Sequence, residues 1–115
     1  MNQQHNAAPH SSLSSPDTKL TFHLIDHADA LRLQVAPQLS VKRKAALGQF
    51  MTPLPIARFM ASLFPPTTLQ TCRLLDAGAG IGALSCAFLD CRACADGFAF
   101  KSVEVDAYEI DDTFR

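Results

Sequence analysis

The chain has 115 residues, of which 48% are hydrophobic, and a formal net charge of −1 at pH 7. The length allows one small globular domain, and the near-zero charge excludes a general electrostatic attraction to nucleic acid. The apolar runs are too short to span a bilayer and the N-terminus carries no secretory signal, so we expect a cytoplasmic protein with no membrane partner.

The first 19 residues are rich in Gln, Asn, Ser and Pro and contain almost no large apolar side chain. They cannot bury enough surface to offset chain entropy, so residues 1–19 are predicted to be a disordered tail. Residues 20–47 are predicted to be an N-terminal helical segment. In it, Asp26 or Asp29 could cap a helix through residues 30–35, and Pro37 would interrupt it.

A basic run, Lys42-Arg43-Lys44, lies in the second part of this segment, on a helical stretch over residues 41–47. Such a run is either a solvated helix face or a patch that contacts phosphate groups. Gly48 is placed to end the helix as a C-cap.

Residues 48–115 are predicted to form an incomplete α/β domain. An extended element ends at Thr52 and Pro53, and Thr52 could also cap the helix that follows. That helix, of about ten residues, has large apolar side chains at helical spacing, and Phe59 and Met60 are interpreted as core residues.

A strand is predicted over residues 72–77, a glycine-rich turn after it, a helix over residues 82–94 and a second strand within residues 98–110. Asp111 or Asp112 would cap a further helix. A single β-α-β unit leaves sheet edges and faces uncovered. We therefore predict the first part of a larger Rossmann-like domain.

Possible metal ligands are present, but their spacing does not favour a metal site. The cysteines are Cys72, Cys86, Cys91 and Cys94, and they lack the second paired knuckle of a structural zinc site, so we interpret them as free thiols. His23 and His27 have no visible third ligand and are interpreted as surface or packing histidines.

Acidic residues flank the glycine-rich turn in a pattern that indicates an adenosine ligand. Asp76 ends the first strand, immediately before the Gly78, Gly80 and Gly82 series, and Glu109 ends the second strand. A carboxylate at the second strand tip can accept both ribose hydroxyls, while the turn N–H groups and the next helix N-terminus receive polar ligand atoms. The spacing differs from the Gly-x-Gly-x-x-Gly typical of dinucleotide sites.

The series Asp-x-Gly-x-Gly-x-Gly resembles the first motif of S-adenosylmethionine-dependent methyltransferases. Together with LGQFMTP upstream and YEID downstream, it resembles the N-terminal half of the γ-type adenine-N6 DNA methyltransferases of bacterial restriction–modification systems. The resemblance covers residues 42–115. It implies S-adenosyl-L-methionine as cofactor, DNA as substrate, and a cognate restriction endonuclease as a possible partner.

The resemblance implies roles for the extended element and the first strand. Thr52, in the family's Phe-x-Thr-Pro element, would bind the methionine carboxylate of the cofactor, and Phe50 and Met51 would line that end of the pocket. Asp76 would stand near the methionine amino group through the turn.

It also implies roles for the turn and the second strand tip. Gly78 and Gly80 would allow backbone contact with the cofactor, Glu109 would bind the ribose hydroxyls, and Ile110 would pack on the adenine ring. Asp111 would be a helix cap rather than a ligand.

The family's catalytic motif, Asn/Asp-Pro-Pro-Tyr/Phe, does not occur in this sequence, whose one Pro-Pro pair is Pro65-Pro66. It binds the flipped adenine in the family, as base-modifying enzymes require. We therefore expect a truncated chain that is inactive alone. The alternatives are a fragment of a ribosomal RNA adenine N6-dimethyltransferase, and a non-catalytic fragment or subunit of a split methylase.

Overall fold

The computed structural model describes residues 23–47 and 50–114. The predicted tail and the Gly48 cap lie outside them. The elements in order are α1 (Leu24–Val35), η1 (Ala36–Gln38), α2 (Val41–Leu47), α3 (Leu54–Ser62), β1 (Thr71–Ala77), α4 (Ala83–Asp96), β2 (Ser102–Tyr108) and η2 (Asp112–Phe114). The chain is thus a mixed helix and strand structure. No helix within the described residues is long and apolar enough to cross a membrane.

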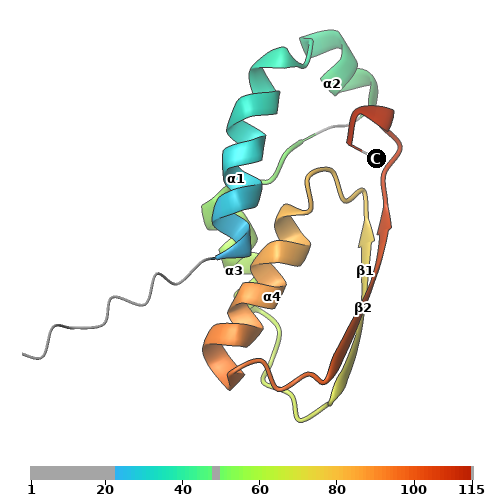
Figure 1. Ribbon diagram of the computed structural model, residues 1–115. Helices are drawn as coiled ribbons and strands as arrows, with labels where there is room; N and C mark the ends of the chain where they lie inside the picture. The colour runs from blue at the N-terminus through green and yellow to red at the C-terminus, as the bar shows by residue number, and fades with distance from the viewer. Residues whose placement is uncertain (1–22, 48–49, 115) are drawn as a thin grey trace, which may run out of the picture.

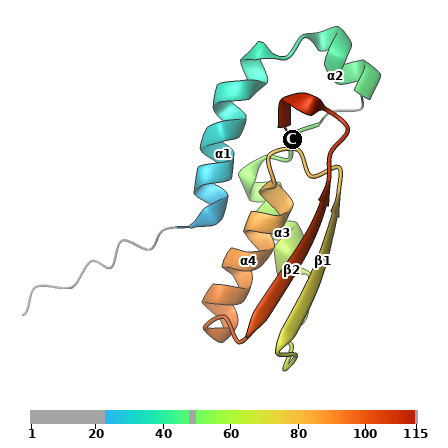
Figure 2. The ribbon, with the colours of Figure 1, turned by 45° about the vertical axis from the view of Figure 1, so that its right-hand side comes forward.

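The two strands form a parallel sheet, in register from the Thr71–Ser102 pair to the Ala77–Tyr108 pair. Helix α4 connects them, and α1, α3 and α4 all lie on one side of the sheet (Figures 1 and 2). The opposite face is polar in its middle, where Arg73 lies 3.2 Å from Glu104 and 3.7 Å from Asp106. The β-α-β unit predicted from the sequence is therefore present.

The core lies where helices α1, α3 and α4 contact one another, mostly through alanine side chains. Its buried residues are Ile25 and Ala28 of α1, Ala57 and Ala61 of α3, and Ala83 and Ala87 of α4. Alanines let helix backbones approach closely, so α4 packs against both α1 and α3 and forms the centre of the fold.

The prediction that Phe59 and Met60 are core residues is wrong. Their side chains are 62% and 42% exposed, whereas Ala57 and Ala61 of the same helix are buried. Helix α3 contacts α4 through its alanine side chains. Because the two helices approach closely there, Phe59 and Met60 lie largely outside the contact.

The start of α1 also differs from the prediction. The helix begins at Leu24, and neither Asp26 nor Asp29 caps it. Asp90 of α4 does so instead, because its two carboxylate oxygens accept the N–H groups of Leu24 (3.0 Å) and Ile25 (2.8 Å). The break at Pro37 is confirmed, since η1 replaces α1 there.

Part of the basic run on α2 makes contacts within the protein. Arg43 forms an ion pair with Asp111 at 2.6 Å, and Lys44 donates to the Ala36 carbonyl at 2.9 Å. Lys42 and Arg43 remain exposed, and phosphate contact by this run stays a prediction.

Candidate functional site

The turn between β1 and α4 requires its glycines. Gly78, Gly80 and Gly82 have φ angles of 84°, 53° and 77°, a region that residues with a Cβ adopt at a cost. No atom lies within 4 Å of the position that a Cβ on Gly78 would take, so the backbone there borders open space. The turn thereby presents bare backbone at the carboxyl end of the sheet.

The turn is tied to the end of β2. The Tyr108 carbonyl accepts the N–H groups of Gly78 (2.7 Å) and Ala79 (2.9 Å), and Glu109 Oε2 accepts that of Gly80 (2.7 Å). The expectation that these turn N–H groups receive ligand atoms is therefore not met here, because all three bond to the protein.

Glu109 links both sides of the site. Its Oε1 accepts the Asp111 N–H at 2.7 Å, while Oε2 holds Gly80. A carboxylate has about four acceptor positions, so two backbone bonds leave capacity for ligand hydroxyls. The side chain is thus oriented before any ligand arrives.

A pocket opens over the turn. It is lined by Phe50, Met51, Thr52, Gly78, Ala79, Gly80, Ile81, Ala83, Leu84, Glu109, Ile110 and Phe114. The structure therefore brings together every predicted site residue except Asp76. This hollow measures about 140 Å³, and a more open one of about 920 Å³ adjoins it over the same turn and shares Gly78, Gly80 and Glu109 with it. A cofactor role for these residues stays a prediction at this point.

Two apolar side chains on the rim are exposed. Phe50 is 88% and Ile110 is 76% accessible. Thr52 is half-buried in the lining, and Pro53, not Thr52, occupies the N-cap of α3 without a side-chain bond. The prediction that Thr52 could cap α3 is therefore wrong, and Thr52 instead lines the pocket.

Asp76 is buried but turned away from this pocket. Its Oδ2 accepts a short hydrogen bond from Ser85 Oγ on α4, and it lines a separate hollow between α3, β1 and α4. Asp76 therefore links β1 to α4 beneath the turn.

Sequence reasoning missed Phe114 and Ser85. Phe114 reaches the pocket from η2, one turn beyond Asp111, which caps η2 by accepting the Thr113 N–H at 3.0 Å. Its apolar character four residues after Ile110 was the available signal. Ser85 in the first turn of α4 was a signal too, because a hydroxyl there can reach the preceding strand.

The four cysteines carry free thiols, and within residues 23–47 and 50–114 no cluster of His, Cys, Asp or Glu could hold a metal ion. Burial raises the pKa of the Cys86 thiol, and the nearby Asp90 and Asp76 carboxylates raise it further. Cys86 is therefore protonated at neutral pH and is a poor nucleophile.

Two curated proteins are similar to this chain. Type II methyltransferase M.BsuBI of Bacillus subtilis is 50% identical over 66 residues, 57% of this chain and 13% of the relative. Type II methyltransferase M.PstI of Providencia stuartii is 34% identical over 95 residues, 83% of this chain and 18% of the relative. No family model and no solved structure matches the chain.

The chain thus spans less than a fifth of either relative, since it covers 13% and 18% of them. The resemblance to restriction–modification DNA methyltransferases that the sequence predicts is confirmed by these two matches.

Proposed function

We propose that this chain is the cofactor-binding segment of an adenine-specific DNA methyltransferase of a restriction–modification system. The main support is that one pocket is lined by residues 50–52, the glycine turn and Glu109, three segments that lie far apart in sequence. The similarity to two type II methyltransferases supports it.

The pocket suits S-adenosyl-L-methionine in its chemistry. The bare backbone at Gly78 leaves room for close approach, and the exposed Ile110 side chain offers an apolar surface for a flat ring. Glu109 has acceptor capacity for ribose hydroxyls, and Thr52 lies on the wall for a polar end group. When bound, the cofactor supplies the methyl group that the family transfers to adenine N6 in DNA.

Each residue in or beneath the pocket then has a binding or positioning role. Glu109 would hold the ribose while its backbone contacts keep the turn closed, and Ile110 and Phe114 would cover the adenine. Thr52 would orient the methionine carboxylate, with Phe50 and Met51 beside it. Asp76 would support the turn through Ser85, in place of the expected position near the methionine amino group. Orientation of this kind, rather than covalent catalysis, accelerates methyl transfer.

The remaining parts of the proposal concern the whole protein. Residues 20–47 would be its N-terminal helical segment, and residues 48–115 would belong to a Rossmann-like methyltransferase domain. DNA is its substrate, a cognate endonuclease its partner and the cytoplasm its location. Because the catalytic Pro-Pro tetrapeptide is absent from this sequence, methyl transfer requires a further segment. The named relatives favour this proposal over a ribosomal RNA enzyme.

Ile110→Ala tests the proposal without endangering the fold, because the Ile110 side chain is largely exposed. We expect weak binding of S-adenosylmethionine by the wild-type chain, and about a fivefold weaker affinity in the variant, equivalent to about 1 kcal/mol of lost apolar burial. Isothermal titration calorimetry measures both, and thermal unfolding should be unchanged.

The matched control is Leu69→Ala, which removes another exposed apolar side chain just before β1, at the opposite end of the sheet. Its affinity should equal that of the wild type. Equal affinities in Ile110→Ala and Leu69→Ala would contradict the assigned adenine contact, and binding by neither these variants nor the wild type would contradict the proposed function.

A further inference from the structure

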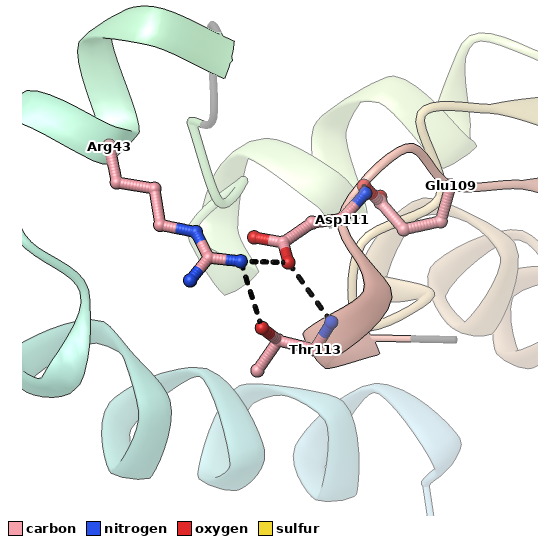
Figure 3. A network of polar contacts seen from close by, with 4 residues as sticks. All are labelled: Arg43, Glu109, Asp111 and Thr113. Atoms are coloured by element: carbon pink, nitrogen blue, oxygen red, sulfur yellow. Dashed lines mark hydrogen bonds and ion pairs between the residues drawn. The ribbon is translucent and has the colours of Figure 1, made fainter.

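An ion pair between the half-exposed Arg43 and the buried Asp111 joins α2 to the segment that follows β2. The Asp111 side chain is completely buried, at 0% exposure, and Arg43 Nη2 lies 2.6 Å from its Oδ1. The same nitrogen donates to Thr113 Oγ1 at 3.2 Å, and Oδ1 also accepts the Thr113 N–H at 3.0 Å (Figure 3). The Arg43 guanidinium and the Asp111 carboxylate therefore both bind Thr113, and together they fix the segment that follows β2.

This loop also carries the candidate cofactor carboxylate. The Asp111 N–H donates to Glu109 Oε1, and Glu109 Oε2 accepts the Gly80 N–H, both at 2.7 Å. Arg43 is therefore linked to the glycine turn through Asp111, whose side chain it binds and whose backbone N–H donates to Glu109. Figure 3 shows Arg43 reaching from α2 toward Asp111, with Glu109 on the same loop.

We propose that Arg43 is a positioning residue for the cofactor site: by holding the buried Asp111, it keeps the loop in the conformation that aims Glu109 at the glycine turn. The proposal rests on the function proposed above. It assigns to the basic run of α2 a task in cofactor binding and not in phosphate contact.

The chemistry of the pair explains why an arginine is required. A buried carboxylate has lost its hydration and needs a charged, hydrogen-bonding partner. A guanidinium presents donors in a rigid fork, so that it can hold Asp111 and Thr113 together, whereas a lysine ammonium is a flexible point charge. Ser40 supports the placement, because its Oγ accepts the Arg43 N–H at 3.2 Å at the start of α2.

The test compares Arg43→Ala and Arg43→Lys with the wild-type chain by amide hydrogen exchange. The Gly80 and Asp111 amides report directly on Glu109, because both donate to it. We expect Arg43→Ala to raise their exchange rates at least about fivefold, as the loss of hydrogen bonds to a buried charge implies, and Arg43→Lys to restore part of the protection. The α4 amides should stay unchanged.

Affinity for S-adenosylhomocysteine, measured by calorimetry, gives a second readout, which we expect Arg43→Ala to weaken severalfold. Arg58→Ala is the matched control. It removes an arginine whose ion pair with Asp26, at 3.1 Å, joins α3 to α1 away from the pocket, so neither readout should change.

Unchanged Gly80 exchange in Arg43→Ala would overturn the proposal, and so would a uniform rise across all helices, which indicates a merely structural arginine. A wild-type chain that binds no S-adenosylhomocysteine would contradict the proposed function instead. In that case the exchange rate of Gly80 still decides whether Arg43 orders Glu109.

Discussion

The Glu109 side chain is held in place by two backbone N–H groups, which would favour its proposed contact with the cofactor ribose. Each carboxylate oxygen accepts one N–H, from Gly80 and from Asp111, at 2.7 Å. These bonds restrict the rotamers of the side chain before binding, so less conformational entropy is lost when a ligand arrives. The same bonds make Glu109 a structural residue of the turn, and a substitution there alters both roles at once.

Cys86 gives a residue-scale prediction with a defined pH dependence. Its raised pKa lowers the thiolate fraction at any given pH, and the thiolate is the reactive form. We expect iodoacetamide to modify Cys86 more slowly than the exposed Cys94 near neutral pH, and the Cys86 rate to rise as the pH increases. Peptide mapping by mass spectrometry measures the two rates.

Urea-unfolded protein is the control for this comparison, because all four thiols are then accessible and should react at similar rates. Equal rates for Cys86 and Cys94 in the folded chain would contradict the burial and the carboxylate environment described for Cys86.

At the scale of elements, α1 depends on α4 for its beginning. Asp90 accepts the Leu24 and Ile25 N–H groups, which no α1 side chain satisfies. We expect Asp90→Ala to lower the free energy of unfolding by about 1–2 kcal/mol, the usual loss for a helix cap. Urea denaturation followed by circular dichroism measures this change.

Asp106→Ala is the matched control, because it removes an exposed aspartate that lies 3.7 Å from Arg73 on the open sheet face. Such a pair contributes at most about 0.5–1 kcal/mol. If Asp90→Ala were no more destabilising than Asp106→Ala, the cap would have no role in stability.

The sequence predicts these elements well where the signal is local. Glycine spacing predicted the turn, whose positive φ angles confirm it, and apolar periodicity predicted α3 and α4. Helix α4 continues past the expected residue 94 to Asp96, because Gly97 with φ 63° provides the stop. The Asp90 cap could not be predicted, since it joins residues 65 positions apart. The burial of Ala57 instead of Phe59 depends on how closely two helices approach, which periodicity does not encode.

At the scale of the whole molecule, the fold brings distant segments to one end of the sheet. The extended element after α2, the turn after β1 and the segment after β2 meet at the carboxyl ends of the strands (Figures 1 and 2). Open α/β sheets bind ligands at this edge. The residues that the family resemblance assigns to the cofactor, except Asp76, therefore lie together, while the Arg43–Asp111 pair, 68 residues apart, left no local pattern to detect.

The central claim, that the glycine turn and Glu109 form an adenosyl-cofactor site, is tested most directly by titrating isotope-labelled chain with S-adenosylhomocysteine and recording amide chemical shifts. We predict that the largest changes occur at Gly78, Gly80 and Ile110, with little change at Arg73 and Glu104 on the open sheet face. Shifts confined to that face, or no shifts around the turn at saturating ligand, would contradict the account.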